Sequence, residues 1–273
     1  MADTNNPVKR TGVIGLGAMG LQMARHMIAK GFDVAGYDIA AEANARAKDH
    51  GVRICASPAE VGAHAEVAII MVQTDAQVSD VVLSSGLLDR LTRGAVICIA
   101  SSVSPDLCRE LAQAAATKGI GVLDTPVVLG QEAATNGTLT IYVGGEDKWV
   151  ERAKPALSAF GRVLHLGACG NGQIAKTINN MLLWACMTAN FEALTLAKKL
   201  GADIPRLVTA LGQGSGANWS LSRWGKSTGK WSEKDMDVAL ELAQDAKVPV
   251  PLGGLVDQLV KHINQEKMKA LLS

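Results

Sequence analysis

Three glycines near the start of the chain have the spacing of a loop that holds phosphate groups. They occur in Gly15-Leu16-Gly17-Ala18-Met19-Gly20, between the apolar segment 10–14 and the helix-forming segment 21–30. In such a turn the first glycine permits the tight bend, the second lets the backbone approach a pyrophosphate, and the third lets helix and strand pack closely. Free N–H groups at the helix start then face the phosphates. The pattern predicts a dinucleotide site; the alternative is a glycine-rich turn used only for packing.

A carboxylate ends the next predicted strand. Residues 34–37 read as a strand, and Asp38 follows at the position where an acidic residue binds both hydroxyls of an adenine ribose. A carboxylate there repels the 2′-phosphate of NADP, and the segment after it has no arginine before Arg46. NAD is therefore favoured over NADP as the cofactor. The alternative role of Asp38 is to cap the helix that comes next.

Lys176 and Asn180 are four residues apart in a segment, 173–200, that predicts one long helix. That spacing puts both side chains on one face of the helix. Burial and a nearby cationic nicotinamide lower the pKa of a lysine, which can then take a proton from a substrate hydroxyl and return it. Asn180 would hold the same oxygen. Alternatively, Lys176 extends to water from the first turns of the helix.

Strand-like and helix-like segments alternate through the first part of the chain. The later strand candidates are 67–72, 95–100, 121–124, 138–143 and 163–166. The alternation predicts an α/β fold with a Rossmann-type, doubly wound parallel sheet. After residue 172 the chain reads as helices only. We therefore predict an NAD-binding domain over 1–165 and an all-α domain for substrate binding and oligomerisation over 166–273. The long helix between them is apolar nearly all round, which predicts burial on most faces.

Composition limits the classes of protein that the chain can belong to. Its 273 residues, 48% hydrophobic and 19% charged, fit a globular protein with a large core, and a net charge of +1 does not indicate nucleic-acid binding. The five cysteines form no CxxC pair and the histidines no ligand pattern, so we expect no metal site. The polar start and the lack of a membrane-spanning apolar run predict a cytoplasmic protein with no membrane partner.

Five motifs occur in order along almost the whole chain. They are the glycine turn, Ser101-Ser102-Val103-Ser104-Pro105, Asp124-Thr125-Pro126-Val127, Gly170-x-Gly172-x-x-x-Lys176-x-x-x-Asn180 and Lys234-Asp235. Together they resemble the β-hydroxyacid dehydrogenase family, which includes 3-hydroxyisobutyrate dehydrogenase, tartronate semialdehyde reductase and, more distantly, 6-phosphogluconate dehydrogenase.

The resemblance implies an NAD-dependent oxidoreductase that transfers a hydride between nicotinamide and a small 3-hydroxy acid or related alcohol. It implies that Lys176 is the general acid/base and that Asn180 helps bind the substrate. Ser102 then contacts both cofactor and substrate, and Lys234 reaches towards the cofactor. The family positions that line the nicotinamide correspond to Val72, Gln73 and Gln77.

One stretch departs from the family pattern. The family continues Asp-x-Pro-Val with Ser-Gly-Gly, whose hydroxyl and backbone amides hold the substrate carboxylate, whereas this chain has Val128-Leu129-Gly130. Losing a hydrogen-bond donor to a charged group costs about 1.5–3 kcal/mol, and an apolar wall disfavours a buried carboxylate further. The substrate therefore either lacks a carboxylate at this point or is larger and more apolar. Gln131 or Glu132 could supply a new polar contact, or both are surface residues.

The second half of the chain gives two weaker indications. Trp219 follows a glycine-rich stretch and is either an aromatic wall over the substrate or a residue packed between short helices. The long helix has more apolar surface than a small helical domain can cover, so we expect a homodimer or a homotetramer.

Two other functions stay open beside the dehydrogenase. A keto or imine reductase on the same scaffold would act on a substrate without a free carboxylate, although the retained Lys176 disfavours the imine version. A nucleotide-binding module without turnover is the other possibility, and the intact set of Lys176, Asn180 and Lys234 disfavours it.

Overall fold

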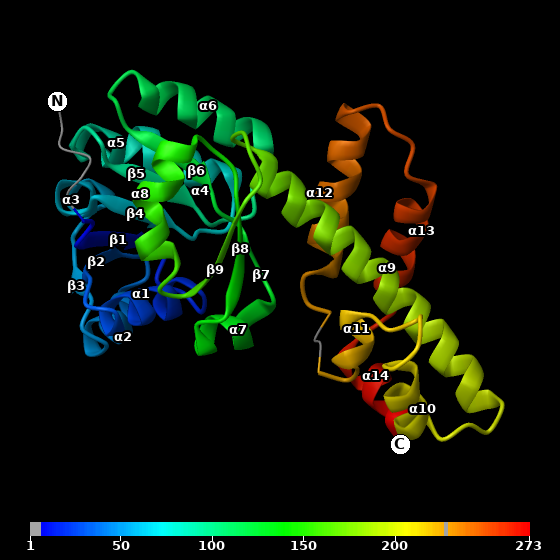
Figure 1. Cartoon of the computed structure of the whole chain (residues 1–273). Helices are drawn as coiled ribbons and strands as arrows, with labels where there is room; N and C mark the ends of the chain where they lie inside the picture. The colour runs from blue at the N-terminus through cyan, green and yellow to red at the C-terminus, as the bar shows by residue number, and fades with distance from the viewer. Residues whose placement is uncertain (1–6, 227–228) are drawn as a thin grey trace. The chain divides into compact units, whose positions relative to one another are not determined.

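The computed structural model describes residues 7–226 and 229–273; the polar start, 1–6, lies outside them (Figure 1). The chain divides into two compact units, 1–176 and 177–273. This division falls inside helix α9 (Asn171–Lys199), whereas we placed the domain boundary at residue 165. The difference has a physical reason, because the first turn of α9 is hydrogen-bonded to the first unit.

The first unit contains a six-stranded sheet in the order β3-β2-β1-β4-β5-β6, with every neighbouring pair parallel. Its strands are β1 (Arg10–Ile14), β2 (Asp33–Tyr37), β3 (Arg53–Ile54), β4 (Val67–Ile70), β5 (Val96–Ile99) and β6 (Gly121–Asp124). The strand order reverses between β1 and β4, and open sheets of this kind bind ligands there, outside the carboxyl ends of the strands. The predicted Rossmann-type sheet is confirmed.

Successive side chains of the strands enter two separate cores, one on each face of the sheet. Val13 and Ile69 belong to one core, and their neighbours Ile14 and Ile70 belong to the other. Such strands read as continuous apolar runs because both faces are covered. The helices of this unit are α1 (Gly20–Ala29), α2 (Ala41–Asp49), α3 (Pro58–His64), α4 (Asp75–Ser79), the π-helix η1 (Asp80–Ser84), α5 (Leu87–Arg90), α6 (Pro105–Ala116), α7 (Gly130–Asn136) and α8 (Asp147–Leu157).

The last strand candidates do not extend the parallel sheet. Strands β7 (Val127–Val128), β8 (Leu139–Val143) and β9 (Gly161–His165) form a separate three-stranded sheet, antiparallel between β7 and β8 and parallel between β8 and β9. The connection from β7 to β8 contains only the short helix α7, which is too little chain for a parallel crossover. The sequence prediction of one sheet for all strand-like segments is corrected here.

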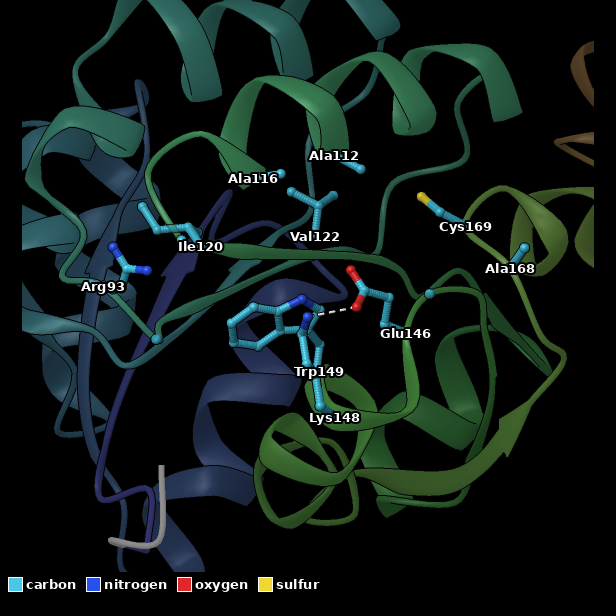
Figure 2. A pocket seen from close by; sticks show the side chains of 13 residues that line it. Arg93, Ala112, Ala116, Ile120, Val122, Glu146, Lys148, Trp149, Ala168 and Cys169 are labelled. Carbon is cyan, nitrogen blue, oxygen red and sulfur yellow. Dashed lines mark ion pairs between the residues drawn. The ribbon is translucent and has the colours of Figure 1, made fainter. Parts of the chain in front are cut away.

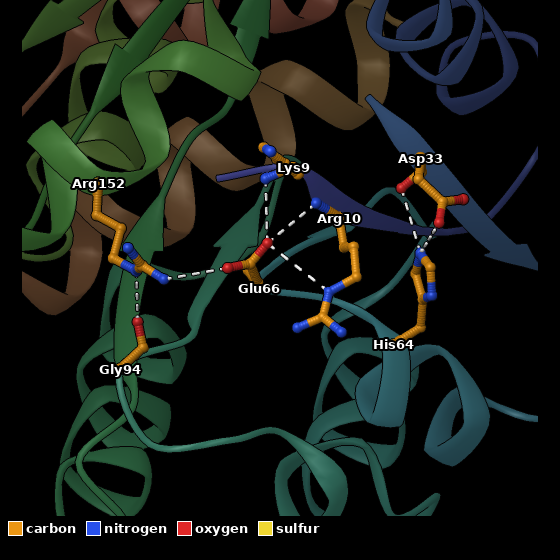
Figure 3. A network of polar contacts seen from close by, with 7 residues as sticks. All are labelled: Lys9, Arg10, Asp33, His64, Glu66, Gly94 and Arg152. Carbon is orange, nitrogen blue, oxygen red and sulfur yellow. Dashed lines mark hydrogen bonds and ion pairs between the residues drawn. The ribbon is translucent and has the colours of Figure 1, made fainter. Parts of the chain in front are cut away.

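A half-buried carboxylate, Glu66, links segments at the amino-terminal ends of the strands (Figure 3). It accepts the backbone N–H groups of Lys9 and Arg10, each at 3.0 Å, and pairs with Arg152 of α8 at 3.5 Å. Arg152 in turn donates to the Gly94 carbonyl at 2.8 Å. Burial alone would raise the pKa of Glu66, but the two N–H donors and the arginines hold it below its usual value of 4.5.

We expect this carboxylate to make folding stability depend on pH. Because the pKa is lower in the folded chain, the contribution is present above about pH 4.5 and is lost as the pH falls through the folded value. Glu66→Gln should therefore lower the free energy of unfolding by about 1–2 kcal/mol at neutral pH. Melting temperatures of both proteins between pH 7 and pH 3 check this, and a gap that does not narrow in acid would contradict it.

The described residues of the second unit form helices joined by turns, with no strand, as predicted. Besides most of α9 it contains α10 (Ile204–Leu211), α11 (Trp219–Ser222), α12 (Ser232–Asp245), α13 (Pro251–Val260) and α14 (Gln265–Leu272). Its core is built from Trp184, Met187, Leu194, Leu221, Trp224, Met236, Val256 and Met268. None of the helices described has both the length and the hydropathy needed to cross a membrane.

In the single chain, helix α9 is buried along one side only. One side carries buried residues such as Asn180, Trp184 and Met187, while Ile178 and Leu182 on another side are 50% and 63% exposed. Leu196, further along, is exposed as well. Helix α9 therefore has more apolar surface than a single chain covers.

Candidate functional site

The glycine turn between β1 and α1 has the geometry that a pyrophosphate requires. Gly15 has φ +92°, and a Cβ on it would lie 2.2 Å from the Met71 carbonyl oxygen. A Cβ on Gly20 would lie 1.9 Å from the carbonyl oxygen of Gly15, so only glycine lets the helix start this close to the strand. A Cβ on Gly17 would meet nothing within 4 Å, which leaves the space over its backbone open for a ligand. Ala18 and Met19 complete the turn, and Gly17 and Ala18 are exposed.

The Asp38 carboxylate faces this turn from the end of β2. Its Oδ2 accepts the Leu16 N–H at 2.7 Å and its Oδ1 accepts the Ala40 N–H at 2.8 Å. The side chain of Asn44 holds the Asp38 backbone from both sides. An ionised carboxylate has about four acceptor positions, so two stay available for ribose hydroxyls. The side chain of Asp38 thus orders the turn before α2 and still fits an adenine ribose.

The loops after β4 and β5 lie side by side at the carboxyl edge of the sheet. The Val72 N–H donates to the Ser101 hydroxyl at 2.8 Å, and the Gln73 N–H donates to the side-chain oxygen of Gln77 at 2.9 Å. Ser101 is buried, whereas Ser102 is exposed. The structure therefore brings Val72 close to the loop that carries Ser102.

Asp124, at the end of β6, caps the start of α9. Its carboxylate is fully buried and accepts the N–H groups of Gly170 at 2.7 Å and Gln173 at 2.8 Å. Burial and the charge of Asp124 raise the pKa of the nearby Cys169 thiol to about 12, so this thiol stays protonated and also bonds to Asp124. Asp124 opens one of the five family motifs, and the structure gives it a capping role that the motif alone does not predict.

Gly170 and Gly172, the two glycines of the motif that ends in Asn180, make that close approach possible. Gly170 has φ +96°, and a Cβ on it would lie 2.9 Å from the guanidinium of Arg109. A Cβ on Gly172 would lie 2.7 Å from both the Asp124 carboxylate and the Tyr142 carbonyl oxygen. A larger residue at position 172 would push the start of α9 away from β6, and one at position 170 would be strained by the positive φ.

Gln173 is a second residue that sequence reasoning did not single out. Its side-chain nitrogen donates to the Ser101 carbonyl at 2.7 Å, and its side-chain oxygen accepts the Val103 N–H at 3.3 Å. Lys176 follows one turn later and is partly exposed, and Asn180 follows one turn after that on the same helix. The sequence signal for this role of Gln173 is a polar amide side chain at the start of a largely apolar helix.

The stretch that departs from the family pattern has an unusual backbone. Val128 is buried in β7, so its side chain is covered within the chain. Leu129 has φ +82° and is 39% exposed, and Gly130 has φ +75°. A left-handed conformation costs a residue with a side chain about 1–2 kcal/mol. Leu129 therefore holds a backbone shape typical of glycine while it projects an apolar side chain outward; Gln131 and Glu132 are exposed.

In the second unit, Lys234 lies near the start of α12 and is exposed. Its neighbour Asp235 accepts the indole N–H of Trp184 at 3.0 Å, which fixes the start of α12 against α9. Trp219 is 44% exposed, with the Arg223 guanidinium 5.3 Å from its ring, and Trp224 belongs to the core. The structure leaves Trp219 available for contact and shows that Trp224 packs.

A cavity of about 830 Å³ lies along β6, between α6 and α8 (Figure 2). Its walls include Arg93, Ile120, Val122 and the indole of Trp149, against which Lys148 is held. None of the predicted site residues lines it. Among the residues that the structure describes, no cluster of histidine, cysteine and carboxylate side chains has the makings of a metal site.

Comparison with known proteins gives two family models that together span the chain. Residues 10–170 match the NAD-binding domain of 6-phosphogluconate dehydrogenase, and residues 170–271 match the NAD-binding domain of NADP-dependent 3-hydroxyisobutyrate dehydrogenase.

Individual relatives agree with these models. The chain is 34% identical to 3-hydroxyisobutyrate dehydrogenase of Pseudomonas aeruginosa, over 90% of this chain and 89% of that one. It is 31% identical to 2-(hydroxymethyl)glutarate dehydrogenase of Eubacterium barkeri, over 96% and 93%. The structure of Mycobacterium tuberculosis 3-hydroxyisobutyrate dehydrogenase with L-serine superposes with a TM-score of 0.88 at 26% identity, covering 97% of this chain and all of that one.

The glycine turn, the capped start of α9 and these matches along the whole chain lead to one assignment. The chain belongs to the β-hydroxyacid dehydrogenase family of oxidoreductases, which act on CH–OH groups with a nicotinamide dinucleotide.

Proposed function

We propose that this chain interconverts a small 3-hydroxy acid and its carbonyl form, with Lys176 as the general acid/base. The observation that carries the proposal is the placement of Lys176 on α9. In the first turn of α9, the Gln173 side chain is hydrogen-bonded to Ser101 and Val103, on either side of Ser102. A proton-transferring lysine would thus be held beside the loop that faces the nicotinamide.

In the oxidation, the Lys176 amine takes the proton of the substrate hydroxyl as the carbinol carbon loses its hydride. The nicotinamide ring, when bound, supplies the acceptor for that hydride. In the reduction, the protonated Lys176 returns the proton to the alkoxide oxygen. By the family pattern, we propose that Asn180 and Ser102 hold the substrate through hydrogen bonds and that Lys234 contacts the cofactor.

The side chain of Leu129 suggests which substrate the site prefers. It replaces a glycine of the family pattern and is exposed, so it would add an apolar surface where relatives hold a carboxylate. The relatives named above act on 3-hydroxyisobutyrate and on 2-(hydroxymethyl)glutarate, two 3-hydroxy acids that differ in the substituent on the carbon bearing the carboxylate. We propose a 3-hydroxy acid with an apolar substituent at this point.

Turnover across a panel of substrates tests the proposal directly. Absorbance at 340 nm would follow NAD and NADP reduction with 3-hydroxy acids, with their esters and amides, and with simple alcohols. Turnover of the free acids supports the proposed reaction. Turnover only of uncharged compounds would replace it with the keto-reductase alternative, and cofactor binding without turnover on any compound would leave a nucleotide-binding module.

We further propose NAD as the preferred cofactor, on the strength of Asp38. Its two free acceptor positions suit ribose hydroxyls, and its charge opposes a 2′-phosphate. The described neighbours on the following turn, Ile39 and Ala40, bring no positive charge to offset it.

Asp38→Ala should lower the preference for NAD over NADP at least tenfold. The variant loses charge-assisted hydrogen bonds to the ribose, each worth about 1.5–3 kcal/mol, and it no longer repels the phosphate. The ratio of kcat/KM for the two cofactors measures this. Asp49→Ala, which removes an exposed carboxylate from α2, is the matched control and should leave the ratio unchanged. An unchanged ratio in Asp38→Ala would refute this account of cofactor choice.

We also propose that the chain works as a homodimer or homotetramer in the cytoplasm. The exposed apolar side chains of α9, among them Leu182 and Leu196, support association. All five cysteines are free thiols, which suits a reducing compartment. Light scattering of the purified protein would measure its mass, and a monomer at micromolar concentration would contradict the first part.

A further inference from the structure

A continuous hydrogen-bond network joins the start of α9 to both loops that carry predicted nicotinamide-facing residues. The Val72 N–H donates to the Ser101 hydroxyl, the Ser101 carbonyl accepts from the Gln173 side chain, and Gln173 also accepts the Val103 N–H. Ser101, Val103 and Gln173 are all buried. Water therefore cannot replace these bonds if the groups move apart.

Asp124 completes the network from the other side of the helix start. Its two carboxylate oxygens hold the N–H groups of Gly170 and Gln173, so the backbone and the side chain of Gln173 are both fixed. The first turn of α9 cannot shift or rotate without breaking buried bonds. Residues three apart on a helix share a face, which places Lys176 over Gln173.

We propose that Gln173 is a positioning residue that sets where the Lys176 amine lies relative to Ser102 and the nicotinamide-facing loops. The inference rests on the proposed function, in which Lys176 moves the substrate proton. Proton transfer requires hydrogen-bond reach between the reacting groups, and a displacement of about 1 Å can cost about a hundredfold in rate. Gln173 itself touches neither proton nor substrate.

The test compares two glutamines that bond to backbone carbonyls. Gln173→Met keeps the length of the side chain and removes both of its hydrogen bonds. Gln265→Met makes the same change in the second unit, where Gln265 donates to the Gly225 carbonyl at 3.3 Å. We expect Gln173→Met to lower kcat about 10–100-fold and Gln265→Met to leave kcat unchanged. The Kd of NADH, from fluorescence titration, should change less than about threefold in both, because ribose and pyrophosphate bind at the glycine turn and Asp38.

Gln173→Glu adds a pH signature that a merely structural role would not produce. A neutral carboxyl group can donate to Ser101 and accept from Val103 as the amide does, whereas the carboxylate repels the Ser101 carbonyl. In the reduction direction, kcat of Gln173→Glu relative to the native protein should rise as the pH falls. The same ratio for Gln173→Met should stay flat. If Gln173→Met does not fold, the ratio for the isosteric Gln173→Glu decides the question.

The outcomes separate this inference from the proposed function. A hundredfold loss in Lys176→Ala, with Gln173→Met within threefold of Gln265→Met and no pH-dependent recovery in Gln173→Glu, would overturn the positioning role alone. An unchanged rate in Lys176→Ala would overturn the proposed function and the positioning role with it.

Discussion

Lys176→Ala is expected to lower kcat at least a hundredfold and to leave the Kd of NAD within a few-fold of the native value. General acid/base catalysis contributes about 10²–10⁴-fold to a rate, and alanine can neither take nor return a proton. We propose that the dinucleotide binds at the glycine turn and Asp38, which lie between β1 and α1 and at the end of β2 rather than on α9. Steady-state rates at saturating cofactor, together with NADH fluorescence titration, measure the two quantities.

A second lysine of the same helix provides the control for this substitution. Lys199 lies in the last turn of α9 and is exposed, so Lys199→Ala removes a similar charge and stem without touching the proposed site. Its kcat should equal that of the native protein. Equal rates in Lys176→Ala and Lys199→Ala would remove Lys176 from the mechanism, and a large rise in the Kd of NAD would instead make it a cofactor ligand.

The second large effect is a contrast between two glycines of the same turn. Gly17→Ala should fold normally and weaken NAD binding at least tenfold, because its Cβ meets no protein atom and enters the space kept for the pyrophosphate. Gly20→Ala should lower the free energy of unfolding by about 1–3 kcal/mol, because its Cβ would overlap the Gly15 carbonyl oxygen and force the turn to move. Cofactor binding then falls with the disturbed turn.

Thermal denaturation with and without NAD separates the two effects. Gly254→Ala in α13 is the control, because a Cβ there would also meet nothing within 4 Å. It should not lower the melting temperature, and it should not change the affinity for NAD. A destabilised Gly17→Ala, or a Gly20→Ala as stable as Gly254→Ala, would mean that the turn differs from the geometry described.

The parallel sheet could be predicted from sequence because its strands are buried on both faces and therefore read as continuous apolar runs. Residues 67–72 and 95–100 are examples. The glycine turn in addition predicts where a dinucleotide binds on this sheet. The second sheet could not be predicted in this way. The composition of residues 138–143 indicates a strand, but it does not indicate which neighbour that strand pairs with.

The candidate site shows the same limit. Lys176 and Asn180 could be found because their spacing is local and their chemistry is specific. The capping role of Asp124 and the hydrogen bonds of Gln173 could not be predicted because the partners lie far along the chain, 46 residues from Asp124 to Gly170 and 72 from Ser101 to Gln173. Several of those partners are backbone groups, which every residue type carries and which leave no trace in composition.

At Leu129, thermal stability and substrate selectivity favour different residues because the backbone there is left-handed. Glycine adopts this conformation without the cost that leucine bears, so Leu129→Gly relieves local strain. The same change removes the apolar side chain that we propose contacts the substrate. A laboratory selection for survival at high temperature alone would therefore enrich glycine here, and the variants recovered would accept a wider range of acids than the parent.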